Sequence, residues 1–250
     1  MSSTRISSLI LLCLCLFAAC AHAQSCADAL RRASGSQFTQ SVSAQNLQIP
    51  AKAWQHLEKA RAASESNQPQ VFARETERAL EIAPQFAEIY LLRAAQQLRL
   101  GQNEAALENV AAARRIEPDL PWSHVIEAGA LTQFRRYDEA VAELDRARGE
   151  EAASWQASFE RARAETGRHD SAAALHWSEL AVEAAPVGCT DVLLVRANAF
   201  QIAGRAPEAI HQLELYLELD RRGVNHPQVL AALESAKATL DTKDTKVARK

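Results

Sequence analysis

Apolar and small residues recur through most of this chain at the three- and four-residue spacing that is typical of amphipathic helices. In residues 87–120, two such stretches are separated by Gly101 and followed by Pro118. Glycine suits a tight turn, and proline cannot continue a helix. The pattern therefore predicts two helices joined by a turn. Residues that favour strands are sparse, with only 3 Tyr in 250 residues, and we expect an all-α protein.

The same unit recurs with a fixed period. Pro84 and Pro118 are 34 residues apart and Pro186 follows 68 residues later, although the chain has only 8 prolines. Several alanines keep the 34-residue step, among them Ala60, Ala94, Ala128 and Ala162, and Ala79, Ala113, Ala147 and Ala181. Such a period predicts a row of stacked helical pairs, in which neighbours bury the apolar face that one pair alone would expose.

Residues 87–120 resemble a tetratricopeptide repeat (TPR). The residues that carry the resemblance are Tyr90, Ala94, Gly101, Ala106, Ala113 and Pro118. The resemblance implies a right-handed α-solenoid of about five helix-turn-helix repeats, closed by a C-terminal capping helix. We place the repeats near 53–86, 87–120, 121–154, 155–189 and 190–223, and the cap over 227–240.

The fourth repeat departs from the family pattern. Arg161 and Glu165 fall at positions that the family buries, and Gly167 comes about two residues before the expected turn. We therefore expect the first helix of this repeat to be rotated so that it buries Trp155, Phe159 and Ala162, which recur at helical spacing.

The segments that flank the repeats have a different composition. Residues 24–52 are rich in Ser, Gln and Ala without a sustained helical period, and residues 241–250 alternate acidic, Thr and Lys side chains. We expect the first segment to be mobile and the second to be a disordered tail.

The first 23 residues have the pattern of an export signal. An almost wholly apolar stretch over 6–19 follows Arg5 and precedes small residues at Ala21 and Ala23. This stretch is 14 residues long, short of the ~20 that a membrane-spanning helix needs. The sequence predicts an exported protein that is either periplasmic or secreted.

Two processing routes stay open. Cleavage before Gln24 releases a soluble chain, whereas the residues from Leu16 to Cys20 resemble the lipobox of bacterial lipoproteins, with Phe17 as the departure. Lipidation of Cys20 would produce an outer-membrane lipoprotein, and only in that case do we expect contact with a membrane.

Cysteine usage depends on this processing. After cleavage before Gln24, the remaining cysteines are Cys26 and Cys189. In an oxidising compartment they can form a disulfide that joins the N-terminal segment to the fifth repeat, and two unpaired thiols are the alternative.

No catalytic, cofactor-binding or metal-binding motif is found in the sequence. The histidines are scattered over the repeats: His169 and His176 flank a predicted turn, and His56 and His124 share a repeat position, where we expect helix packing. A formal net charge of −3 supplies no basic surface for nucleic acid. We expect no enzyme, no cofactor and no nucleic-acid partner.

The remaining candidate site is the concave face, which the resemblance assigns mainly to the first helix of each repeat. Its expected partner-binding residues are Trp54, Leu57, Arg61, Glu88, Leu91, Leu98, Trp122, Val125, Phe159 and Leu194. An apolar residue at the fifth position of every repeat predicts a hydrophobic stripe that binds a helix or an extended peptide. The alternative is that the protein itself covers these residues.

These observations predict a non-catalytic protein–protein interaction scaffold or adaptor of the cell envelope, which binds another polypeptide in its concave groove. The alternative is a membrane-tethered TPR lipoprotein that assists outer-membrane or pilus assembly. The sequence specifies neither the partner nor the oligomeric state.

Overall fold

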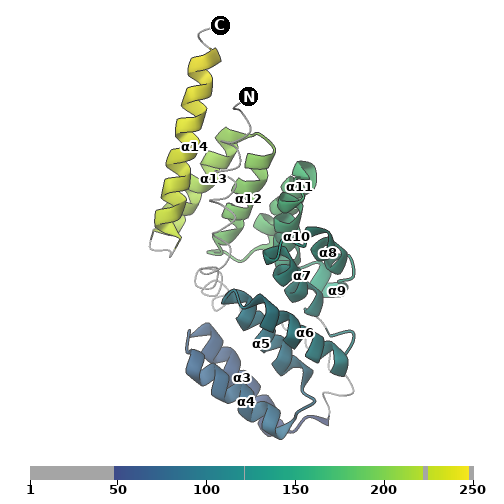
Figure 1. Cartoon of the computed structure of the whole chain (residues 1–250). Coiled ribbons are helices and arrows are strands. Elements are labelled where there is room, and N and C mark those ends of the chain that lie inside the picture. The colour runs from purple at the N-terminus through teal and green to yellow at the C-terminus, as the bar shows by residue number, and fades with distance from the viewer. Residues whose placement is uncertain (1–47, 121, 222–224, 248–250) are drawn as a thin grey trace.

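The computed structural model describes residues 48–247 except residues 121 and 222–224, and every regular element in this part is an α-helix (Figure 1). The helices are α3 (Ala51–Glu65), α4 (Pro69–Ile82), α5 (Ala87–Arg99), α6 (Asn103–Ile116), α7 (Ser123–Gln133), α8 (Tyr137–Leu144), α9 (Gly149–Ala152), α10 (Trp155–Gly167), α11 (Ser171–Ala184), α12 (Asp191–Ile202), α13 (Ala206–Leu219) and α14 (His226–Val247).

Consecutive helices pack in pairs, namely α3 with α4, α5 with α6, α7 with α8, α10 with α11, and α12 with α13. The first pair begins at Ala51, two residues before the first expected repeat. The first helices of successive pairs also contact one another, whereas contacts between the second helices are sparse or absent in the described part. The first helices therefore line the inner side of the row. The expected all-α solenoid is confirmed.

The turn inside each repeat contains one residue with left-handed backbone geometry. These residues recur every 34 residues, with a last step of 35: Asn67, Gly101, Arg135, His169 and Gly204. Only two of the five are glycine, the residue that adopts positive φ without steric cost. A one-residue lengthening therefore falls between the fourth and fifth turns.

Gly167 is not the turn residue that its early position suggested. It ends α10, and a Cβ atom at this position would lie 2.3 Å from the Tyr137 ring. The left-handed residue of this turn is His169 instead. Gly167 is needed because α8 and α10 approach closely.

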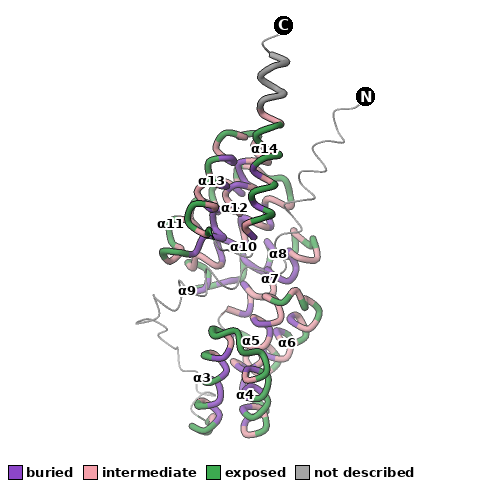
Figure 2. Tube along the Cα trace, turned by 90° about the vertical axis from the view of Figure 1, so that its left-hand side faces the viewer, coloured by how far each residue is buried: buried purple, intermediate pink, exposed green. Residues whose placement is uncertain are grey.

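The buried residues lie on the sides of the helices that face their neighbours (Figure 2). The largest apolar cluster joins the fourth and fifth repeats to α14, and it contains the fully buried Tyr216 and Val229. Contact with α13 identifies α14 as the expected cap.

Two expectations about the array need correction. The sequence predicts a disordered tail over residues 241–250, but α14 continues as a helix to Val247. The first helix of the fourth repeat buries Phe159 and Ala162 as expected but leaves Trp155 partly exposed, and it also keeps Glu165 buried at 2% exposure. Arg161 Nε donates to Glu165 Oε1 at 3.0 Å, and this ion pair allows the packing positions to hold charged side chains.

Candidate functional site: the inner face of the first helices

The expected hydrophobic stripe is not an exposed surface. Leu57, Leu91, Val125 and Phe159 are between 0% and 8% exposed, and Leu194 is partly buried against the largest cluster. The physical reason is the close approach of neighbouring repeats: Leu57, for example, belongs to the same cluster as residues of α5 and of the turn before it. For these four buried residues the prediction of an exposed stripe is wrong, and the protein itself covers them.

The other expected groove residues are more accessible. Trp54, Arg61, Glu88, Leu98 and Trp122 are all partly exposed. Whether these residues bind a partner stays a prediction. They place aromatic, charged and aliphatic groups together on the inner side, which is a composition typical of interaction surfaces.

Three tryptophans lie at the N-terminal ends of first helices. Trp54 contacts the Phe86 ring edge-on at 4.6 Å between centroids, and Trp155 contacts Phe159 in the same way at 6.2 Å. Trp122 packs partly buried against the cluster that contains Leu91. We call Trp54, Trp122 and Trp155 the tryptophan row. Its members take part in packing and still expose part of each indole.

A largely buried ion pair lies on the first helix of the fourth repeat, α10. Glu160 on α10 is paired with Arg163 at 2.7 Å, and burial raises the pKa of Glu160 although Arg163 opposes this shift. A Cβ atom on Gly129 of α7 would lie 2.7 Å from Leu98 and 3.3 Å from the Glu160 carboxyl carbon. Gly129 therefore lets α5, α7 and α10 approach closely.

His56 and His124, which share a repeat position, lie in the packing between helices. His56 Nδ1 is 2.7 Å from Glu75 Oε2, and His124 Nδ1 is 2.9 Å from Glu143 Oε2. Each pair joins the first helix of a repeat to its second helix. Both histidines therefore act as structural cross-links.

Opposing effects set the pKa values of these carboxylates. The hydrogen bond with His56 lowers the pKa of Glu75, against the effect of burial. Burial alone would raise the pKa of Glu143, but the hydrogen bonds from His124 and Arg114 and the charge of Arg114 together lower it. Burial raises the pKa of Glu127, which also pairs with Arg114.

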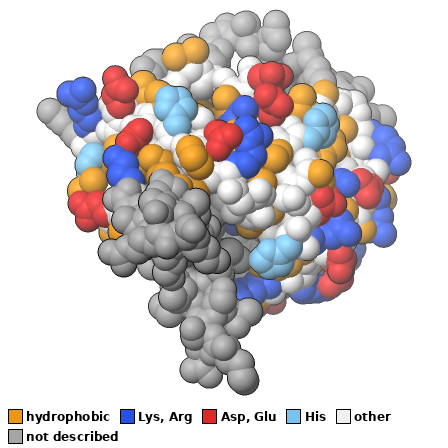
Figure 3. All heavy atoms as spheres, turned by 90° about the horizontal axis from the view of Figure 1, so that it is seen from above, with side chains coloured by type: hydrophobic (Ala, Val, Ile, Leu, Met, Phe, Trp, Pro, Cys, Tyr) orange, Lys and Arg blue, Asp and Glu red, His pale blue; other side chains and the backbone are white. Residues whose placement is uncertain are grey.

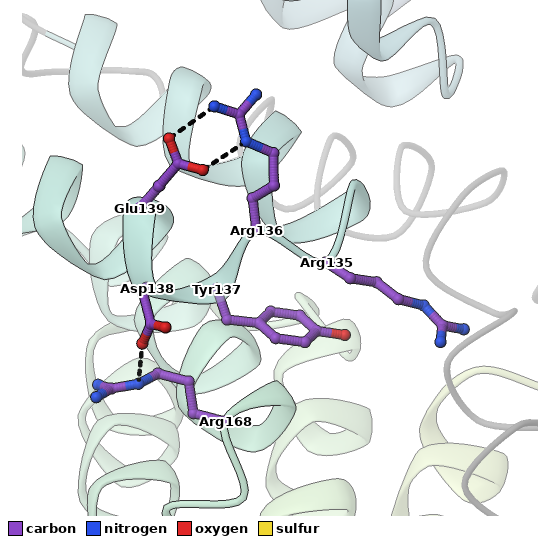
Figure 4. Close-up of a pocket in the computed structure, with 6 residues that line it drawn as sticks. All are labelled: Arg135, Arg136, Tyr137, Asp138, Glu139 and Arg168. Carbon is purple, nitrogen blue, oxygen red and sulfur yellow. Dashed lines mark hydrogen bonds and ion pairs between the residues drawn. The ribbon is translucent and has the colours of Figure 1, made fainter.

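A polar pocket of about 450 Å³ lies beside the turn of the third repeat (Figure 4). Its lining residues are Arg135, Arg136, Tyr137, Asp138, Glu139 and Arg168. Most of its charge is neutralised locally, because Arg136 pairs with Glu139 at 2.6 Å and Arg168 with Asp138 at 2.9 Å. Arg135 points away from these pairs in Figure 4. The pocket offers ion pairs but no acid–base constellation.

The scattered histidines do not converge. His169 lies in a turn, while the His176 ring contacts Trp177 at 5.2 Å. Within the described ranges, no group of three or more His, Cys, Asp or Glu side chains has the geometry of a metal site.

None of the described helices is both long and apolar enough to span a bilayer. Seen from the end nearest α14, the surface mixes acidic, basic and apolar side chains (Figure 3).

Cys189 lies two residues before the start of α12 and is disulfide-bonded. The sequence has only four other cysteines, Cys13, Cys15, Cys20 and Cys26, and all of them lie outside the described residues. Pairing of Cys189 with Cys26, and lipidation of Cys20, therefore stay predictions.

No protein-family model matches the chain, and no curated protein matches its sequence. Among solved structures, it is similar to TTC0263, a thermophilic TPR protein in Thermus thermophilus, with a TM-score of 0.60 and 18% identity over 74% of this chain and 99% of that one. A match to the TPR domain of P58(IPK) has a TM-score of 0.36 and 14% identity over 96% and 81% of the two chains, which is too low to carry an argument. The first similarity shows that this chain has a TPR fold.

Proposed function

We propose that this chain is a non-catalytic scaffold or adaptor that binds another polypeptide along the inner face of its first helices. The observation that carries the proposal is the accessible mixture of aromatic, aliphatic and charged residues on this face, at Trp54, Arg61, Leu98 and Trp122. Partly exposed indoles supply large contact area, and charges beside them supply selectivity. Because the fifth-position residues are buried, the proposed surface is mixed in character rather than a continuous apolar stripe.

We further propose that the scaffold works in the cell envelope, on the basis of the apolar stretch over 6–19 and the small residues before Gln24. Mass spectrometry of the mature N-terminus tests this directly. A chain that begins at Gln24 supports a periplasmic or secreted scaffold. A lipid-modified Cys20 supports the tethered lipoprotein instead. A chain that still begins at Met1 in every cell fraction contradicts both.

The binding surface is tested by crosslinked capture from an envelope extract, followed by affinity measurement with the purified partner. Arg61→Glu and Leu98→Glu change partly exposed residues of the inner face. Arg115→Glu is the matched control, since Arg115 is an exposed residue on the second helix α6. We expect each inner-face variant to weaken binding by about tenfold or more, and the control to bind like wild type.

Circular dichroism and the urea midpoint of each variant establish that folding is retained. Equal loss of binding in all three variants would point to general charge effects. Unchanged binding in Arg61→Glu and Leu98→Glu would remove the inner face as the binding surface.

A further inference from the structure

The fourth repeat has a small side chain where the other repeats have a bulky one. Ser158 on α10 lies at the repeat position that holds His56, Tyr90, His124 and Leu193 in the other four repeats. In the first and third repeats, the histidine at this position bonds to Glu75 or Glu143 of the second helix. The second-helix residue equivalent to Glu143 in the fourth repeat is Trp177. A serine and an indole therefore replace the polar cross-link here.

The helix that would cover Ser158 is also interrupted. At the preceding junction, Arg114 of α6 reaches across to His124 at 2.7 Å. The residue equivalent to Arg114 one repeat later is Arg148, but α8 already ends at Leu144, whereas the other second helices are 14 residues long. Arg148 has extended backbone and donates to two carbonyl oxygens of its own loop. Within the described residues it therefore makes no hydrogen bond to the fourth repeat.

A pocket of about 280 Å³ lies where these two changes remove bulk, between α9, α10 and α11. We call it the α9–α11 pocket. Its apolar lining includes Ala152, Ala153, Trp177 and Leu180, and its polar lining consists of Ser158 and Glu183. Sites for whole drug-sized ligands begin at about 300 Å³. The pocket is therefore suited to one long side chain.

Glu183 is the one charged residue among the lining residues of this pocket. Its side chain is exposed, and it has no ion-pair or hydrogen-bond partner within the described part of the chain. The nearby cation Arg161, whose guanidinium lies 5.4 Å from the centroid of the Trp177 ring, is already paired with Glu165 and Asp145. Glu183 therefore adds an unneutralised negative charge to an apolar pocket, and this combination favours a cation on an apolar stem.

A lysine side chain has this combination of groups. Its four-carbon stem can lie against Trp177 and Leu180, while the ammonium group stays at the exposed end of the pocket. The ammonium group has only hydrogen-bond donors, and the side-chain acceptors in the lining are the Glu183 carboxylate and the Ser158 hydroxyl. Both parts of a lysine side chain therefore find complementary groups in the pocket.

We propose that the α9–α11 pocket is a second docking site of this chain, which binds a lysine side chain of a partner polypeptide. None of its lining residues belongs to the inner-face residues on which the scaffold function rests. A polypeptide bound along the inner face leaves this pocket free. The chain can therefore hold a partner at two separate surfaces.

The test titrates the purified chain with N-acetyl-lysine N-methylamide, which carries the side chain between two peptide groups. The reporter is the indole N–H resonance of Trp177, assigned from the spectrum of Trp177→Phe, and the other three of the 4 tryptophans are internal references. We expect a saturable shift of the Trp177 resonance alone. The matched probe N-acetyl-norleucine N-methylamide keeps an apolar stem but has no ammonium group. It should bind about threefold more weakly, which is the effect expected for an exposed ion pair.

Glu183→Gln separates the charge from the shape of the pocket. We expect it to lower the affinity for the lysine probe to that for the norleucine probe and to leave the norleucine affinity unchanged. Glu81→Gln is the matched control, because Glu81 is an exposed residue at the equivalent position of α4. It should bind both probes like wild type.

Ser158→His restores the bulky side chain of the first and third repeats, and we expect it to abolish binding of both probes. Circular dichroism and the urea midpoint establish whether this variant retains the fold. If it does not, Glu183→Gln decides the outcome alone, since it changes only an exposed side chain.

Three results overturn the proposal: no shift of the Trp177 resonance, equal affinity for the two probes, or an equal loss of lysine affinity in Glu183→Gln and Glu81→Gln. These outcomes are independent of the capture experiment. A lysine site in the pocket without inner-face binding would keep this proposal and remove the proposed scaffold surface, and the reverse result would keep only the scaffold surface.

Discussion

The first and third repeats contain the same pair of side chains at the same register and use it differently. His56 bonds to Glu75 at 2.7 Å in the first repeat, and His124 bonds to Glu143 at 2.9 Å in the third. In both repeats the pair joins the first helix to the second. Because the two histidine–glutamate pairs are the same and occupy equivalent positions, any difference between them comes from the neighbouring side chains.

The surroundings differ in where the additional charges come from. Apart from His56, the ion-pair partners of Glu75 within the described residues are Arg74 and Arg78 of its own helix, both more than half exposed. Glu143 also binds Arg114 at 3.1 Å, and Arg114 belongs to α6 of the preceding repeat. One arginine from a neighbour therefore converts a bond within a repeat into a junction between repeats.

The largest expected effect comes from removing the carboxylate at that junction. Glu143→Ala should lower the free energy of unfolding by about 3 kcal/mol, because it leaves Arg114 and His124 partly buried without this partner. Glu75→Ala should cost less, about 1–2 kcal/mol, since its arginine partners turn to water. Urea denaturation of both variants measures the difference, and equal losses would contradict the distinction drawn between the two repeats.

The third repeat is also tightly packed against the fourth. Gly167→Ala should cost about 2 kcal/mol, because the new methyl group meets the Tyr137 ring. Gly149→Ala is the control: no atom lies within 4 Å of the added Cβ, but φ is +56° there, so that this variant reports only the left-handed backbone cost of about 1 kcal/mol. The comparison is made on the thermal midpoint, where a smaller shift for Gly167→Ala than for Gly149→Ala would argue against close packing.

Acid should weaken the two histidine–glutamate pairs. The pKa values of Glu75 and Glu143 are lowered in the folded state, so their stabilising contribution is complete above the unfolded pKa and is lost as pH falls through the folded value. Burial raises the pKa of Glu127 beside Glu143, and that group acts in the opposite direction. We expect Glu75→Gln and Glu143→Gln each to reduce the loss of the free energy of unfolding as pH falls. The effect of Glu143→Gln is expected to be partly offset by Glu127. Chemical denaturation at several pH values between about 3 and 7 tests this, and an unchanged acid limb in both variants would exclude these carboxylates as its origin.

The smallest expected effects concern the left-handed turn residues. Asn67 and Arg135 have φ of 53° and 60° at equivalent turns, but asparagine tolerates this geometry better than arginine. Arg135→Gly should stabilise the protein by about 0.5–1 kcal/mol, and Asn67→Gly by no more than a few tenths. Calorimetry resolves the difference, and a larger gain at Asn67 would show that backbone strain does not set the ranking.

Much of the fold could be predicted from small and turn-forming residues. The 34-residue steps of alanine and proline located the helical pairs, because close helix crossings need small side chains and helix ends need breakers. The left-handed turns at Arg135 and His169 carry no glycine, so that residue type did not reveal them. Arg135 and His169 lie one and two 34-residue periods after Gly101, so that counting from Gly101 would have located both turns.

The candidate site was harder to predict than the fold. The register placed Leu57 and Leu91 on first helices correctly, but register alone does not determine how closely neighbouring first helices approach, and this closeness buries both residues. The charged residues Arg161 and Glu165 suggested a rotated helix, whereas their mutual ion pair lets them stay at packing positions. The bridging role of Arg114 depends on contacts between repeats, which no local pattern reports.

The Cys189 disulfide changes the topology of unfolding. A linear row of repeats can fray from either end, since each repeat is stabilised only by its neighbours. A crosslink between the fifth repeat and a cysteine before residue 27 closes a covalent ring that contains the first four repeats. For a loop longer than 100 residues, such closure removes about 5 kcal/mol of chain entropy from the unfolded state in the loop-entropy model. The first four repeats then unfold within a closed ring, so that the loss of their structure releases less chain entropy than it would in an open array.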